Sequence, residues 1–244
     1  MPDQQTNNSG SEITIGLILP DVLGTYADSG NATVLAQRLR WRGIPARILH
    51  CTAEEEPPTS CDIYLLGGGE DVAQLFAASW LRRHTGLCRA IAETGVTLAV
   101  CAGLQILGRT MTNMDGSEHP GAGLLDITTR PRRHRATGHI VTDCHVPGVG
   151  RLVGFENHRG ATTLGAGARP LGQVVSGIGN GTGGGPGRKS PEGACTDRII
   201  GTYLHGPVLA RNPALADHIL TRATGQPLPD LDVPDQAALR ATYL

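Results

Sequence analysis

Four short strand-like segments, separated by stretches with the spacing of helices, constrain the fold more than any other feature of this chain. They occupy residues 13–19, 46–50, 63–66 and 97–100, and all except 46–50, which contains Arg47 and His50, are mainly apolar runs. Continuous apolar runs of this kind are typical of strands that lie buried on both faces of a parallel sheet. Strands that alternate with helices predict an α/β fold, in which an open, mostly parallel sheet is flanked by helices.

The stretches between these runs support the same fold. Apolar residues at helical spacing predict one helix within 26–42 and one or two helices within 73–94. Further along the chain, an apolar run at 199–204 predicts another strand, and the pattern at 213–224 predicts another helix.

The middle of the chain has a different pattern. Its strand-like pieces, at 127–129, 138–142 and 153–155, are short and divided by turns, so we expect additional β structure that covers the sheet. The basic segment 130–135 is typical of a solvated loop. Eight of the 17 residues in 177–193 are Gly, which predicts a mobile surface loop.

The length of 244 residues suits one domain rather than two. We expect a single domain at 13–226. A polar segment, 1–12, precedes it and predicts a disordered leader, and a tail at 227–244 is acidic and Pro-rich before a short helix.

Composition argues against several classes of protein. A formal net charge of −1 offers no bulk attraction for nucleic acid. The leader lacks the pattern of a secretory signal, and no run reaches about 18 apolar residues, so we expect a cytoplasmic protein without a membrane span. The six cysteines form no Cys-x-x-Cys pair, which argues against a metal site and fits a reducing compartment. No phosphate-loop motif is present, so we expect no nucleotide cofactor on this chain.

Cys101 is the first candidate for chemistry. It stands where the apolar run 97–100 meets a helical pattern, at the edge of the sheet where open α/β folds bind ligands. A sharp strand-to-helix turn exposes a nucleophile there, and the helix N-terminus favours a thiolate. The small residues Ala99, Ala102 and Gly103 suit such a turn. An inert buried cysteine is the alternative.

The glycine run 67–69 follows another strand of the predicted sheet. Its backbone N–H groups, together with that of Ala102, would form an oxyanion hole beside Cys101. An ordinary Gly-rich turn between a strand and a helix explains the same pattern.

His205 is the candidate base, because it ends the predicted strand 199–204 and faces the same sheet edge as Cys101. His158 is its competitor. We prefer His205, since Gly206 and Pro207 predict a turn that holds its ring at the end of the strand.

Taken together, these segments resemble class I glutamine amidotransferases of the CobB/CobQ-like type, which have a flavodoxin-like sheet, and within that group the glutaminase subunits of lipid II isoglutaminyl synthases. The matching segments run in order over nearly the whole chain after residue 12, at 19–26 with Gly30 and Asn31, 67–71, 101–108, 154–158 and 201–207. The first and fourth segments narrow the resemblance to the subunits of lipid II synthases.

The resemblance implies roles for individual residues. Cys101 would be the nucleophile and His205 its general base and acid, while Gly68, Gly69 and Ala102 would donate backbone hydrogen bonds to the oxyanion. Arg135 falls where the family has an arginine that binds the substrate glutamine. The implied reaction is hydrolysis of L-glutamine to glutamate and ammonia through a glutamyl thioester.

The chain departs from the class I pattern at two positions. Ala99 replaces a frequent Gly, and Pro207 stands where the pattern has an acid two residues after the histidine. The resemblance therefore implies that a partner provides the third member of the triad. That partner is a MurT-like subunit of the Mur-ligase family, which would bind ATP, Mg²⁺ and the stem peptide of lipid II and form a heterodimer with this chain.

Two alternatives remain open from the sequence. One is a glutaminase for cobyrinate-type amidation, which normally shares its chain with an ATP-binding domain. The other is a non-catalytic binding module in which the cysteine senses redox state.

Overall fold

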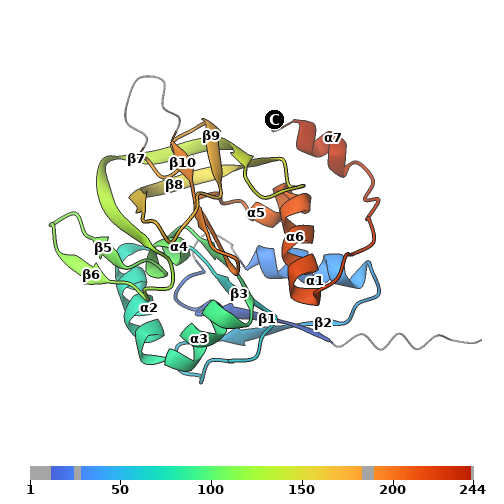
Figure 1. Cartoon of the computed structure of the whole chain (residues 1–244), viewed down its shortest axis with the longest axis horizontal. Helices are drawn as coiled ribbons and strands as arrows, with labels where there is room; N and C mark the ends of the chain where they lie inside the picture. Colours follow the sequence, from blue (N-terminus) through green and yellow to red (C-terminus); the bar gives the residue numbers. More distant parts are fainter. Residues whose placement is uncertain (1–11, 25–28, 183–189, 243–244) are drawn as a thin grey trace, which may run out of the picture.

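The computed structural model describes residues 12–24, 29–182 and 190–242 (Figure 1). The leader expected at 1–12, apart from Glu12, lies outside the described residues, as do the beginning of the helix expected at 26–42 and the centre of the Gly-rich segment.

The first sheet carries the predicted parallel strands. Its order is β11-β12-β4-β3-β1-β2, and all neighbours are parallel except β11 and β12. The strands are β1 (Ile13–Ile18), β2 (Ala46–Cys51), β3 (Ile63–Leu66), β4 (Val96–Val100), β11 (Ala194–Cys195) and β12 (Ile199–Thr202). Strands β1, β3 and β4 are buried along their whole length, which explains their unbroken apolar sequences.

Helices cover both faces of this sheet (Figure 1). They are α1 (Gly30–Arg40), α2 (Asp71–Arg83), α3 (Thr85–Glu93), the short α4 (Ala102–Ile106) and α5 (Val208–Arg211), and α6 (Pro213–Thr224). A last helix, α7 (Gln236–Ala241), lies away from this sheet near the C-terminus. From β1 the chain moves outward to β2, and from β3 it moves the opposite way to β4. Right-handed crossovers therefore place α1 and α2 on opposite faces, and ligands bind at the point where the direction reverses.

A second sheet lies beside α4 (Figure 1). Its order is β10-β9-β7-β5-β6, with β8 paired to β7. The strands are β5 (Thr110–Thr112), β6 (Glu118–Pro120), β7 (Ile127–Cys144), β8 (Arg151–Leu164), β9 (Gly172–Ser176) and β10 (Pro191–Glu192). The additional β structure expected in the second half is therefore present.

The short pieces expected in this region are in fact two long antiparallel strands, β7 and β8. The basic segment 130–135 belongs to β7 and is not a loop, so that expectation was wrong. The register shifts between Pro131 and Ala136, which is an irregularity of the bulge type. Proline lacks a backbone donor, and the polar residues of the bulge interrupt the alternation by which strands are recognised.

The Gly-rich segment is also more ordered at its ends than its composition suggested. Asn180 and Glu192 are fully buried. The side chain of Asn180 donates to the carbonyl of Gly193 (2.9 Å) and accepts from its N–H (2.7 Å). The expected surface loop is thus wrong for these flanks, because side-chain amides and carboxylates bond the glycine backbone.

Candidate active site

A cavity of about 400 Å³ opens at the carboxyl ends of β3 and β4, where it meets the β7–β8 hairpin. Cys101, Gly69, Ala102 and Arg135 all line this cavity. Four residues from three separate segments of the sequence are thus brought to one place. Among the described residues that line the cavity, neither Gly68 nor His205 is present, whereas His158 is.

Cys101 holds the conformation expected of a nucleophile on a sharp turn. Its φ is 54° and its ψ is −105°, values that L-residues rarely adopt. The N–H of Gly103 donates to the carbonyl of Gly67 (3.1 Å), and a Cβ on Gly103 would lie 2.7 Å from the carbonyl of Leu66. A larger residue at 103 would therefore push α4 away from β3, so the small residues at this turn have a steric cause.

His205 follows β12, the neighbour of β4. The two strands pair Thr202 with Val100, and the N–H of Cys101 donates to the carbonyl of Thr202 (2.8 Å). Cys101 and Tyr203 therefore leave the sheet side by side, and His205 comes two residues later with 4% of its surface exposed.

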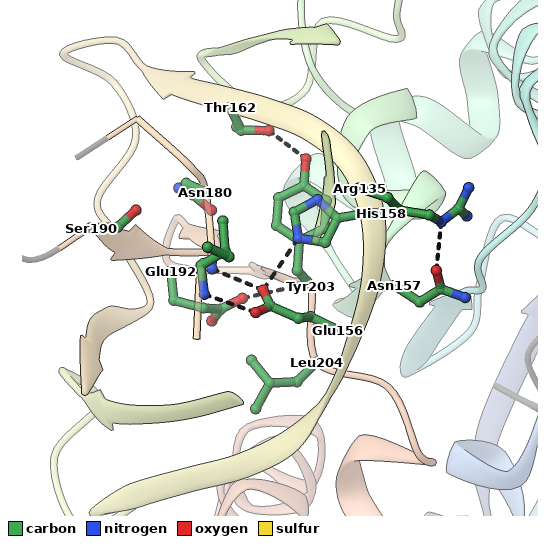
Figure 2. A network of polar contacts seen from close by, with 12 residues as sticks. Arg135, Glu156, Asn157, His158, Thr162, Asn180, Ser190, Glu192, Tyr203 and Leu204 are labelled. Carbon is green, nitrogen blue, oxygen red and sulfur yellow. Dashed lines mark hydrogen bonds and ion pairs between the residues drawn. The ribbon is translucent and has the colours of Figure 1, made fainter. Parts of the chain in front are cut away.

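Arg135 reaches the cavity from the irregular part of β7. Its Nε donates to Oδ1 of Asn157 on β8 (2.5 Å), as Figure 2 shows. Bulges re-aim side chains near active sites, and here Arg135 lines the cavity. Asn157 holds one edge of the guanidinium. The two Nη groups can then pair with a carboxylate in the bidentate geometry that arginine favours.

Two glutamines of the cavity were missed by the sequence reasoning. Nε2 of Gln74 donates to Oε1 of Gln105 (2.5 Å), and Nε2 of Gln105 donates to the hydroxyl of Tyr203 (3.0 Å). Burial raises the pKa of Tyr203 above its usual range, so this hydroxyl remains protonated. Gln105 could have been found, because it stands one helical turn after Cys101. No sequence signal marked Tyr203 or Gln74.

The other five cysteines are buried or half-buried, and none has the lowered pKa of a reactive thiol. Burial raises the pKa of Cys51, Cys61 and Cys144 to about 11, and it also raises the pKa of Cys88 and Cys195. None of the five lines the cavity. Within the described residues, no group of three or more His, Cys, Asp or Glu side chains is arranged to hold a metal ion, and no helix is long and apolar enough to span a bilayer.

Several proteins are similar in sequence to this chain over most of its length. Subunit GatD of the glutamine-hydrolyzing lipid II isoglutaminyl synthase from Staphylococcus aureus is 36% identical over 236 residues, which cover 94% of this chain and 93% of the relative. Subunit GatD from Streptococcus pneumoniae is 32% identical, over 87% of this chain and 80% of the relative. A cobyric acid synthase from Pelotomaculum thermopropionicum is 30% identical over 72% of this chain, but over only 35% of its own length.

The fold also matches a solved structure, the glutaminase domain of Trypanosoma brucei CTPS with bound acivicin. The TM-score is 0.52 at 12% identity, with 91% of this chain and 96% of the other covered. A family model, the CobB/CobQ-like glutamine amidotransferase domain, matches residues 14–213. The chain therefore belongs to the family of CobB/CobQ-like glutamine amidotransferase domains.

Proposed function

We propose that this chain is the glutaminase subunit of a lipid II isoglutaminyl synthase. It hydrolyses L-glutamine to glutamate and ammonia. A MurT-like ligase subunit then uses ATP and the ammonia to amidate the D-glutamate of the lipid II stem peptide. The observation that carries the proposal is the conformation of Cys101, whose sulfur-bearing turn lies in a cavity with Gly69, Ala102 and Arg135. The similarity to GatD subunits over nearly the whole chain supports this substrate.

The chemistry starts with the Cys101 thiolate, which attacks the carboxamide carbon of glutamine. The N–H groups of Ala102, Gly69 and Gly68 stabilise the oxyanion of the tetrahedral intermediate. His205 gives its proton to the leaving nitrogen, the C–N bond breaks, and ammonia departs from a glutamyl thioester. His205 then takes a proton from a water molecule that cleaves the C–S bond and releases glutamate.

Arg135 binds the α-carboxylate of glutamine in this proposal. A bidentate guanidinium matches a carboxylate, and the bond from Nε to Asn157 fixes the plane of the fork. The side-chain carboxamide of the substrate would then point toward Cys101, which lines the same cavity.

The carboxylate that orients His205 comes from the partner in this proposal. Position 207, where many class I members have an acid, is a proline that precedes α5. A carboxylate is needed to hold the imidazole in the correct tautomer and to stabilise its protonated form. ATP and Mg²⁺ belong to the partner as well.

A glutamine analogue with an electrophilic carbon tests the proposal. Mass spectrometry of the purified complex should show one adduct on Cys101, and Cys101→Ser should show none. Cys61→Ser is a matched control, since that buried thiol lies outside the cavity and the variant should label like the wild type. A complex that releases ammonia without labelling at Cys101 would contradict the proposed nucleophile.

The cobyric acid synthase similarity gives a second candidate its basis, namely amidation of a cobyrinate-type substrate. Both candidates use the same glutaminase chemistry and differ in the ligase. Affinity purification of the tagged chain from its native cell separates them, because we expect a Mur-ligase-like protein to co-purify. Absence of any adduct in the presence of the partner would instead favour a non-catalytic binding module.

A further inference from the structure

Three buried ionisable side chains lie at or near the cavity, of which only His158 lines it, and the mechanism above uses none of them. Glu156 and His158 are on β8 with 2% of their surface exposed, and Glu192 on β10 has 0% exposed. Figure 2 shows them gathered around Tyr203. Burial of such groups costs free energy unless hydrogen bonds compensate, so their bonds indicate what they hold in place.

Glu192 holds the backbone that leads to His205, which we call the His205 segment (residues 202–205). Its Oε1 accepts from the hydroxyl of Thr202 (2.9 Å) and from the N–H of Tyr203 (2.7 Å). The same hydroxyl accepts from the N–H of Leu204 (3.0 Å). Glu192 thus fixes one amide directly and the next through Thr202.

Strand β8 adds two backbone hydrogen bonds to the His205 segment. The N–H of His205 donates to the carbonyl of Phe155 (2.7 Å), and the N–H of Phe155 donates to the carbonyl of His205 (3.2 Å). Three successive amides after β12 are therefore satisfied, although only the last of them by another backbone group. Glu192 provides the anchor for the first two.

The ring of Tyr203 is held on its face as well. His158 stacks on it, with 3.7 Å between ring centroids and 13° between planes. Nε2 of His158 lies 3.5 Å from Oε2 of Glu156, whose two oxygens also accept from the N–H groups of Ile178 (2.8 Å) and Gly179 (3.0 Å). Two contacts thus hold Tyr203, namely the stacked imidazole of His158 on its ring and the hydrogen bond from its N–H to Glu192.

We propose that Glu192 is a positioning residue for His205, because it sets the course of the His205 segment and thereby the direction of the imidazole toward Cys101. This inference rests on the proposed glutaminase function. Glu192 lies at the end of the Gly-rich segment 177–193, so this part of the segment would contribute to catalysis.

Burial raises the pKa of Glu192 to about 7, so below that pH the side chain is mainly a neutral carboxyl group. Its Oε2 has no hydrogen-bond partner among the described residues. Glutamine has the same shape and offers the same acceptor oxygen. Glu192→Gln should therefore keep the two bonds, whereas Glu192→Ala removes both and leaves buried donors unsatisfied.

The test is steady-state kinetics of glutamine hydrolysis by the complex at pH 6.5. We expect Glu192→Ala to lower kcat by about 10- to 100-fold, because small displacements of a catalytic group have effects of that order. KM should stay within about threefold, since Arg135 does not move, and Glu192→Gln should keep kcat within about threefold of wild type. Glu55→Ala is the matched control. Glu55 also accepts from a backbone N–H and a threonine hydroxyl, both of Thr52 at 2.8 Å, but lies outside the cavity.

A second pair of variants covers the case in which Glu192→Ala does not fold. Thr202→Val keeps the volume but loses the hydroxyl that links Glu192 to Leu204, and Thr202→Ser keeps the hydroxyl. We expect kcat to fall about fivefold or more in the first variant and to be retained in the second.

Wild-type kcat in folded Glu192→Ala or in Thr202→Val would overturn the inference, and so would a Glu192→Gln variant as slow as Glu192→Ala. These outcomes are distinct from failure of the proposed function. If the proposed function fails, the wild-type complex does not hydrolyse glutamine, or the Cys101→Ser variant hydrolyses it as fast as the wild type does.

Discussion

Cys101 stores backbone strain at the position where we place the reaction. Its φ of 54° lies in a region that suits glycine and few other residues. Two backbone hydrogen bonds hold this conformation, from the N–H of Cys101 to the carbonyl of Thr202 and from the N–H of Gly103 to the carbonyl of Gly67. The surrounding fold compensates for the strain, and this backbone conformation places the sulfur at the N-terminus of α4.

This strain predicts an inverted order of stability at position 101. Cys101→Gly should be more stable than Cys101→Ala by about 1–2 kcal/mol, because only glycine adopts this φ and ψ without cost. Urea unfolding of both variants measures the difference, and both should be inactive. At an ordinary helix position alanine would be the more stable, so alanine ahead of glycine here would contradict the strain.

Glu192 gives a second prediction at this scale. Its pKa rises from 4.5 to about 7 on folding, so the folded state favours the protonated form. The stabilisation relative to an ionised group is present below about pH 4.5 and is lost as pH rises through 7, by about 3 kcal/mol in total. Wild type should therefore lose about 3 kcal/mol relative to Glu192→Gln between pH 4.5 and pH 8. Urea unfolding of both proteins at the two pH values checks this. If the difference in the free energy of unfolding between them is the same at both pH values, Glu192 does not titrate in this range.

At the scale of elements, the strands of the parallel sheet were predictable and the β7–β8 hairpin was not. β2, β3 and β4 lie within one residue of their expected ranges. For β3 and β4 the reason is that strands buried on two faces need continuous apolar sequence, whereas β2 is an edge strand with exposed positions. α6 spans 213–224, as expected. In β7, buried and exposed residues follow one another without a fixed period, and the pairing with β8 shifts register between Pro131 and Ala136. The sequence of β7 therefore has neither a continuous apolar run nor a regular alternation of apolar and polar residues.

The irregular part of β7 leads to a prediction on substrate binding. Arg135→Lys should raise the KM for glutamine about tenfold or more and leave kcat within about threefold, because a lysine cannot form the bidentate pair. Arg133→Lys is the matched control, since Arg133 belongs to the same basic segment, is exposed and does not line the cavity. Equal KM values for the two variants would place the α-carboxylate elsewhere.

For the whole molecule, sequence reasoning located the site better than it described the site's surroundings. Cys101, Gly69, Ala102 and Arg135 were predicted, and the structure brings them to one cavity. Gln74, Tyr203 and Glu192 were not, because each reaches its partner through a tertiary contact between different elements. A side chain that acts through another residue has no motif of its own.

The proposal that the partner provides the carboxylate for His205 predicts low activity of the free chain. Hydrolysis by the free chain should be at least about 100-fold slower than in the proposed complex with a MurT-like subunit, since loss of this group is costly in other triads. Ammonia release by the chain alone, with and without the purified partner, measures the difference. Equal rates would show that this chain completes its own triad.

The buried flanks of the Gly-rich segment make the protein a tolerant host for inserted sequence. The N–H of Asn180 donates to the carbonyl of Pro191 (2.9 Å), so the chain returns to almost the same point after ten residues. Once such ends are fixed, each doubling of the enclosed length costs only about 0.6 kcal/mol. An affinity tag inserted between Gly185 and Pro186 should therefore cost little stability while the anchored flanks stay in place.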